Sequence, residues 1–156
     1  AAAEKAQGVE KAKLLDQALA AAGDNAVGYD DLIKQIVGLD AGNQAGLRDR
    51  YRIRSRKTDI QGLLRDEKFD EAIANADAFL KDAEPKGADR RDILWLKGLA
   101  LSRKEDMDGT LAALEAAHAA DPAGEEGEKI AQIIEQLKTI KARQEAAKEP
   151  APAPEK

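Results

Sequence analysis

The chain has 156 residues, of which 43% are hydrophobic and only 3% aromatic, and its formal net charge is −5 at pH 7. The absence of cysteine excludes disulfides, thiolate catalysis and cysteine-based zinc sites. No run approaches the about 20 apolar residues that a membrane-spanning helix needs, and the acidic balance argues against a general affinity for nucleic acid. Because alanine supplies much of the hydrophobic content, we expect a thin core whose helices approach one another closely.

The spacing of apolar side chains predicts helices along most of the chain. Within the third predicted helix, residues 48–57 alternate in polarity, which is typical of a strand, but the apolar side chains beside them have helical spacing. We interpret this segment as helical. In chain order, the expected helices are about 9–22, 29–39, 44–65 and 69–80, a fifth around 93–101 with Asp89 as its N-cap, a sixth at 107–119, and a seventh that carries Ile130 to Ile140.

One spacing occurs three times. Counted from Tyr29, Phe69 and Met107, the side chains at offsets of 3, 4, 7 and 10 form one stripe along a helix, and an aspartate follows each starting residue. The starting residues lie 40 and 38 residues apart. A period near 40 that is built only from helices predicts an array of stacked helical hairpins.

Two of these helices carry a more specific pattern. Residues 69–73 read Phe-Asp-Glu-Ala-Ile, and residues 108–122 end in Asp-Pro. Both segments resemble the second helix of the tetratricopeptide repeat, so that the family resemblance covers about residues 58–122. Three residues of the fifth predicted helix are similar to the aliphatic, small and large positions of the first helix of that repeat, and the small one would let the paired helix approach: Leu94, Gly98 and Leu101.

The resemblance implies an all-α fold of about seven helices, stacked as antiparallel hairpins in one domain over residues 1–148. The last helix would cap the array, with its isoleucines inward and its charges outward. Residues 149–156 alternate proline with alanine or charged residues, which favours a disordered, extended tail.

In the tetratricopeptide family, the first helix of each hairpin lines an inner groove that binds peptides. For this chain the resemblance therefore implies a groove with several cations, which would prefer an acidic peptide or protein segment. Trp95 would serve either as an anchor in this groove or as part of the core. The side chains expected to face the groove are Arg54, Lys57, Gln61, Arg65, Trp95, Leu99 and Arg103.

Residues 48–57 contain six basic side chains and one acidic side chain, a local charge of +5. On a helix these basic residues spread around the axis, so we favour a solvated surface that pairs with the many carboxylates of the chain. An acidic protein partner, or RNA or another anionic surface, remains an alternative for this segment.

The residues that carry chemistry are sparse. Ser55 and Ser102 are the only serines, and neither lies in a nucleophile motif. His118 occupies a helical packing position, and a calcium-like run over residues 104–115 begins with Lys104 where a carboxylate is needed. We therefore expect no catalytic, cofactor-binding or metal-binding residues, and no enzyme activity.

These observations predict a soluble, non-catalytic protein-interaction or scaffold module. A second hypothesis is a helical accessory domain of a larger exported protein, for example one with a thioredoxin-like domain. The sequence does not fix the compartment or the oligomeric state. Its start, Ala-Ala-Ala-Glu-Lys without methionine, would suit the product of a signal peptidase and favours export to a bacterial periplasm.

Overall fold

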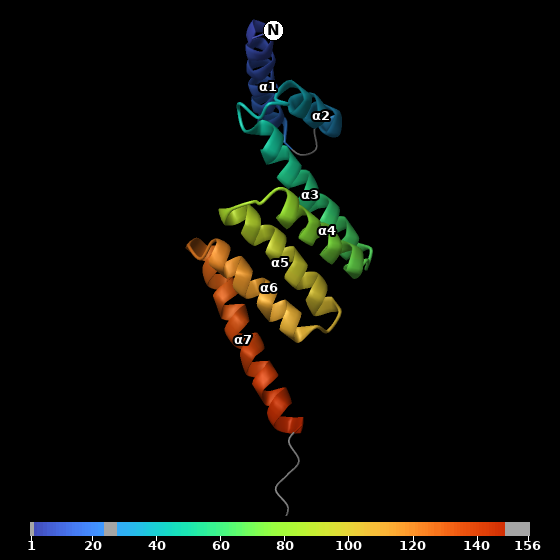
Figure 1. Ribbon diagram of the computed structural model, residues 1–156, viewed down its shortest axis with the longest axis vertical. Coiled ribbons are helices and arrows are strands. Elements are labelled where there is room, and N and C mark those ends of the chain that lie inside the picture. Colours follow the sequence, from blue (N-terminus) through green and yellow to red (C-terminus); the bar gives the residue numbers. More distant parts are fainter. Residues whose placement is uncertain (1, 24–27, 149–156) are drawn as a thin grey trace, which may run out of the picture. The chain divides into compact units, whose positions relative to one another are not determined.

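The computed structural model describes residues 2–23 and 28–148 (Figure 1). These residues form helices joined by short loops and contain no strand, which confirms the all-α prediction and the helical interpretation of residues 48–57. The predicted tail at 149–156 lies outside the described residues. The helices are α1 (Ala2–Ala22), α2 (Tyr29–Leu39), α3 (Leu47–Arg65), α4 (Phe69–Asp82), α5 (Gly87–Arg103), α6 (Met107–Ala120) and α7 (Gly124–Lys148).

The chain divides into two compact units, residues 1–56 and residues 57–156, so the boundary falls within α3. We describe each unit by itself. The expectation of a single domain over residues 1–148 stays a prediction.

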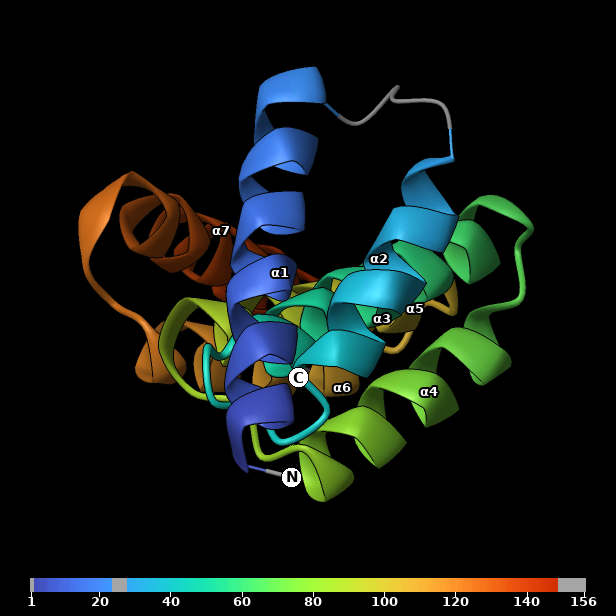
Figure 2. The ribbon, with the colours of Figure 1, turned by 90° about the horizontal axis from the view of Figure 1, so that it is seen from above.

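The first unit is built around the packing of α1 against α2, which lie beside each other in Figure 2. Its core is a cluster of five buried side chains: Ala12, Leu19, Ile36, Leu47 and Tyr51. Helix α1 begins seven residues before the predicted start at Val9. Alanine, glutamate, lysine and glutamine favour the helix even without an apolar stripe, so periodicity alone missed this first part.

A buried carboxylate organises the loop between α2 and α3. Asp40 is fully buried and accepts hydrogen bonds from the backbone N–H groups of Leu47 at 2.9 Å and Ala45 at 3.2 Å. Burial raises the pKa of Asp40, but these N–H groups outweigh it and leave that pKa below its usual value. Helix α3 therefore begins at Leu47 and not at the predicted Gln44, because the loop must first bring its N–H groups to Asp40.

In the second unit, helices that follow one another in the chain pack together: α4 on α5, α5 on α6, and α6 on α7 (Figure 1). Helix α5 begins at Gly87, so Asp89 lies in its first turn and is not the N-cap that the sequence predicted. The core of α5, α6 and α7 is formed by Leu94, Leu111, Leu114, Ala117, Ile130 and Ile134. Ile140, which was expected to face inward, is 43% exposed.

Gly98 lies where α5 packs closely against α6. A Cβ atom built at this glycine would lie 3.1 Å from Cδ2 of Leu114 and 3.7 Å from Cβ of Ala113. Any larger side chain would push α6 away or force Leu114 to move. The predicted packing role of Gly98 is therefore confirmed.

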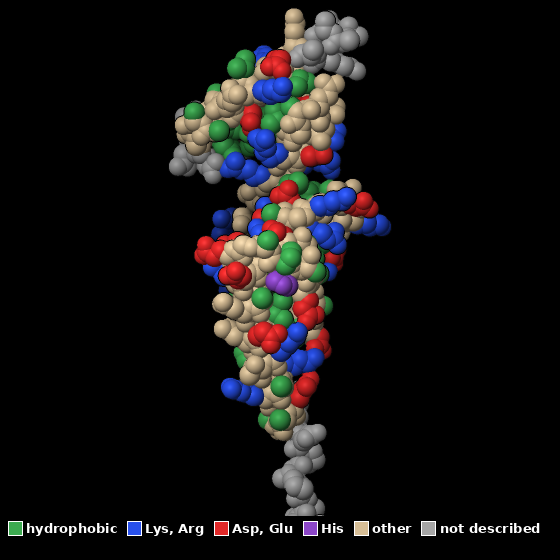
Figure 3. Space-filling view, turned by 90° about the vertical axis from the view of Figure 1, so that its left-hand side faces the viewer, with side chains coloured by type: hydrophobic (Ala, Val, Ile, Leu, Met, Phe, Trp, Pro, Cys, Tyr) green, Lys and Arg blue, Asp and Glu red, His purple; other side chains and the backbone are tan. Residues whose placement is uncertain are grey.

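On the face shown in Figure 3, acidic and basic side chains are interspersed. Neighbouring helices are joined by ion pairs such as Lys97 with Asp77 at 2.6 Å and Lys138 with Glu115 at 3.0 Å. Among the described residues, no helix has both the length and the apolar composition that crossing a membrane requires.

We predict that Gly98→Val lowers the free energy of unfolding of the second unit by about 1–3 kcal/mol, because the added methyl groups overlap with Leu114. Urea unfolding followed by the fluorescence of Trp95 measures this change. Gly62→Ala in α3 is the matched control, since a Cβ there meets only the end of Arg65 at 3.9 Å. The control should gain up to about 1 kcal/mol from helix propensity. A Gly98→Val variant as stable as the natural chain would contradict the close approach.

We predict that Asp40→Ala lowers the free energy of unfolding of the first unit by about 1–3 kcal/mol, because buried N–H groups lose their acceptor. The lowered pKa of Asp40 also fixes the sign of a pH dependence. Its stabilisation is complete above the pKa of the unfolded chain, about 4, and is lost as the pH falls through the lower folded value.

Hydrogen exchange of the Leu47 and Arg48 amides at neutral and acidic pH tests both effects. Asp31→Asn, an exposed carboxylate of α2, is the control and should leave the exchange unchanged. Protection that is equal in Asp40→Ala and the natural chain would refute the role of Asp40.

Candidate functional site

The side chains expected to line a groove are divided between the two units. Arg54 belongs to the first unit, where its guanidinium carbon lies 5.2 Å from the centre of the Tyr29 ring. The other six belong to the second unit. Lys57, Gln61 and Arg65 lie on α3, and Trp95, Leu99 and Arg103 lie on α5. Within each set the residues are four apart, so they share one face of their helix.

Lys57 joins α3 to α5. Its Nζ lies 2.5 Å from Oδ2 of Asp92 and 3.5 Å from Oδ1 of Asp89. Arg91, whose side chain is only 14% exposed, bonds Asp92 at 2.8 Å and Asp121 at 2.6 Å. Partial burial raises the pKa of Asp92, but Lys57 and Arg91 outweigh it and leave that pKa below its usual value. The charge of Lys57 is thus offset by two carboxylates, and its first role is to hold two helices together.

The remaining side chains combine apolar and polar character. Trp95 is half-buried and packs against the core cluster of the second unit, so it belongs partly to the core and partly to the surface. Leu99, one turn later, is 40% exposed. Gln61, Arg65 and Arg103 are exposed. This arrangement offers apolar contact and hydrogen bonding.

Most of the basic side chains in residues 48–57 are engaged within the chain. Arg48 bonds Asp49 at 3.0 Å and the carbonyl oxygen of Ala41 at 2.8 Å, and Arg50 bonds Asp16 at 3.0 Å. Together with the ion pairs of Lys57, these pairs agree with a surface that is neutralised by local carboxylates, whereas Arg54 lies over the ring of Tyr29.

A polar cluster in the first unit was not predicted from the sequence. The hydroxyl of Tyr51 donates a hydrogen bond of 2.6 Å to Asp16. Burial, followed by the hydrogen bond and charge of Asp16, raises the pKa of Tyr51 to about 12. These residues, with Arg50 and Tyr29, line a small pocket of about 170 Å³. Since the partners lie 35 residues apart in the chain, no local motif could reveal them.

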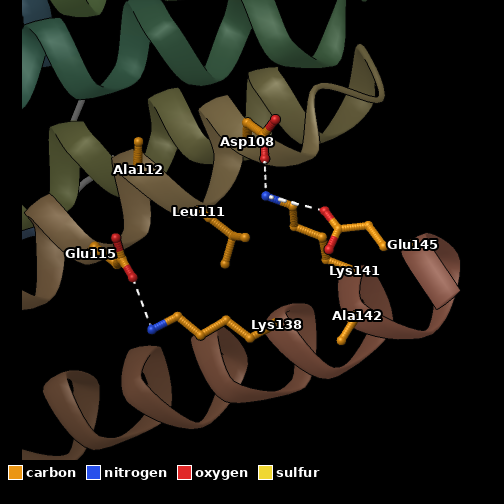
Figure 4. A pocket seen from close by; sticks show the side chains of 8 residues that line it. All are labelled: Asp108, Leu111, Ala112, Glu115, Lys138, Lys141, Ala142 and Glu145. Carbon is orange, nitrogen blue, oxygen red and sulfur yellow. Dashed lines mark hydrogen bonds and ion pairs between the residues drawn. The ribbon is translucent and has the colours of Figure 1, made fainter.

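A shallow groove of about 390 Å³ lies between α6 and α7, with Leu111 between two ion pairs (Figure 4). Asp108 bonds Lys141 at 2.6 Å, and Glu115 bonds Lys138 at 3.0 Å. These carboxylates belong to the calcium-like run, and the pairs direct them to different lysines of α7. Within residues 2–23 and 28–148, no group of three histidine, cysteine or acidic side chains is arranged to hold a metal ion.

Two polar residues of the second unit serve the local structure. Asp106 caps α6 by accepting a hydrogen bond of 2.9 Å from the N–H of Gly109. His118 is half-buried, as its packing position predicts, and its Nδ1 lies 3.1 Å from the carbonyl oxygen of Gly127. Because a carbonyl only accepts, this nitrogen carries the proton and donates it.

The chain matches no protein-family model, no curated protein and no solved structure. The resemblance to tetratricopeptide repeats therefore rests on residues 58–122 of the sequence.

We predict that Asp92→Asn lowers the free energy of unfolding of the second unit by about 1–2 kcal/mol, because Lys57 and Arg91 lose their shared anion at a half-buried position. Urea unfolding followed through Trp95 measures it. Arg65→Ala is the control, since Arg65 and Asp66 are 82% and 61% exposed and 3.9 Å apart. It should change stability by less than about 0.5 kcal/mol. Equal effects of the two variants would refute the role of Asp92.

Proposed function

We propose that the chain is a non-catalytic protein-interaction module of tetratricopeptide-like type, which binds a peptide or protein segment on the face shared by α3 and α5. The observation that carries this proposal is the ion pair of Lys57 with Asp92 at 2.5 Å. It joins α3 to α5, so α3 contacts a helix beyond the one that follows it in the chain. If α3–α4 and α5–α6 are two hairpins, this ion pair joins the first helix of one to the first helix of the next, as stacking of hairpins requires.

The loops and the packing support the hairpin arrangement. Three residues connect α3 to α4, and three connect α5 to α6, and such short connections favour antiparallel neighbours. The close approach at Gly98 brings α5 and α6 together as one hairpin. Helix α7 places Ile130 and Ile134 in the shared core and so acts as the capping helix.

The proposed binding face lies within the second unit. Trp95 and Leu99 supply its apolar centre, and Gln61, Arg65 and Arg103 supply its polar edge. Tryptophan and arginine are the side-chain types that most often contribute strongly to protein binding. Because Lys57 is already paired, the preference for an acidic partner rests on Arg65 and Arg103.

The chemistry of the described residues favours binding over catalysis. The single histidine is committed to a backbone carbonyl, and both serines are exposed on helix surfaces. Asp92 and Asp108 are paired with lysine or arginine. We therefore propose no reaction and no cofactor for the chain.

The proposal predicts that Leu99→Asp releases the partner, because a carboxylate would replace the apolar centre of the face. The full chain would be used for affinity capture from an extract of the source organism. A protein retained by the natural chain should fall at least about tenfold with Leu99→Asp.

Leu14→Asp provides the matched control, since Leu14 is a more exposed leucine, at 65%, in the first unit. It should leave capture unchanged. Circular dichroism would verify that both variants stay helical. A partner retained equally by both variants would overturn the proposed face.

A further inference from the structure

An apolar stripe of α7 begins in the core and continues into solvent. Ile133 and Leu137 are partly buried and pack against the core cluster of the second unit. The stripe continues, alternately three and four residues apart, with three exposed residues: Ile140, Gln144 and Ala147. This heptad spacing is the pattern by which one helix packs along another. We call these five residues the α7 seam.

The exposed part of the α7 seam lies where α7 runs past the helix that packs beside it. Asp108, in the first turn of α6, pairs with Lys141 at 2.6 Å. Beyond that pair, residues 142–147 are all exposed, and Figure 1 shows α7 extending past α6. Ile140 is 43% exposed and is one of three large hydrophobic side chains that the described part of the chain leaves exposed. The end of α7 therefore presents an uncovered apolar face.

Two opposite charges flank this face. Because successive helical residues turn by about 100°, Leu137 and Arg143 lie about 60° to either side of Ile140. On the Leu137 side, the turn between α5 and α6 meets α7 at a groove of about 510 Å³, whose charged lining residue is Glu105. Gln144 also lines this groove, so Glu105 lies near the level of Arg143 along α7.

The two flanking charges have no ion-pair partner among the described residues, and both side chains are exposed. The neighbouring charges are already engaged. Lys141 pairs with Asp108 and with Glu145, and Asp106 caps α6. The α7 seam is thus left with an unpaired carboxylate on one flank and an unpaired guanidinium on the other.

We infer that the α7 seam binds the same seam of a second copy of the chain, with the two α7 helices parallel around a two-fold axis. In a parallel helix pair, each flank of one helix meets the opposite flank of the other. Glu105 of each copy would therefore approach Arg143 of the other, whereas an antiparallel pair would bring like charges together. Gln144 would meet its own counterpart, and a single polar residue in such a seam helps to fix the register of a dimer.

Charge complementarity identifies the occupant, because one face supplies both partners of the ion pair only when it meets a copy of itself. The α7 seam is two heptads long, about 21 Å, so the contact belongs to the small class of interfaces that are weak and transient. We expect a dissociation constant of about 0.1 mM. The inference goes beyond the proposed function and does not depend on it, since Leu99→Asp decides that proposal separately.

Sedimentation equilibrium of the full chain between about 10 µM and 1 mM tests the dimer. The natural chain should change from monomer to dimer across this range, and Ile140→Asp should raise the dissociation constant at least about tenfold. Leu14→Asp, at a leucine that is 65% exposed in the first unit, is the matched control and should leave it unchanged. A chain that stays monomeric at about 1 mM, or a dimer that Ile140→Asp leaves intact, would overturn the inference.

A charge exchange tests the ion pairs. Glu105→Arg and Arg143→Glu should each weaken the dimer about three- to tenfold, since each change affects both symmetric pairs. The double variant should return to within about twofold of the natural chain. Both side chains are exposed, so the variants should remain folded, and circular dichroism would verify this. Weakening that simply adds in the double variant would refute the pairing.

The orientation is tested with single thiols, because the chain has no cysteine. In the parallel pair, Ala147 faces its own counterpart, so Ala147→Cys should form a disulfide-linked dimer when oxidised with diamide. Ala142→Cys, which is exposed on the opposite side of α7, is the matched control and should form much less. Equal cross-linking of the two variants would refute the parallel arrangement around the α7 seam.

Discussion

In the second unit, α5 must meet its neighbours at short range, because few large side chains are available to fill the space between helices. Only 3% of the chain is aromatic, and alanine supplies much of its hydrophobic content. Gly98 makes the short distance to α6 possible, and Ala113 and Leu114 fill the space that the missing side chain leaves. Packing against α6 fixes the rotation of α5 about its own axis. It therefore also determines which side chains of α5 face α3 and α7.

Charged side chains then determine which parts of the surface remain accessible. Lys57, Arg91 and Asp92 form a half-buried network, and such networks add more to the choice of one arrangement than to net stability. The same pairing removes Lys57 from the set of cations that could attract a partner. Charge counted along the sequence therefore overstates the charge that the surface offers, as the arginines of α3 show.

Periodic features of the fold could be predicted from the sequence. The bounds of α2 were predicted as observed, and α4 and α6 end within two residues of the predicted ends, because their apolar stripes repeat with the helical period. The half-buried position of His118 followed from its place in the stripe of α6, and the packing role of Gly98 followed from the resemblance to the tetratricopeptide repeat. The start of α1 was missed because its alanine and charged residues carry no stripe.

Long-range polar contacts could not be predicted. Asp40 looked like the end of a helix, yet it receives N–H groups from the start of the next one. Asp89 looked like an N-cap, yet it pairs with Lys57, which lies 32 residues earlier. Lysine and aspartate are common throughout the chain, so their spacing does not specify which of them meet. The residues that line the grooves between helices depend on such pairings, so they could not be predicted from the sequence either.

The placement of aromatic side chains also gives the two units different optical signals. The only tryptophan, Trp95, lies in the second unit, whereas both tyrosines, Tyr29 and Tyr51, lie in the first. Trp95 touches the core on one side and solvent on the other, so its emission senses both the loss of packing and the arrival of a ligand. Selective excitation of tryptophan therefore follows the unfolding of the second unit without a contribution from the first.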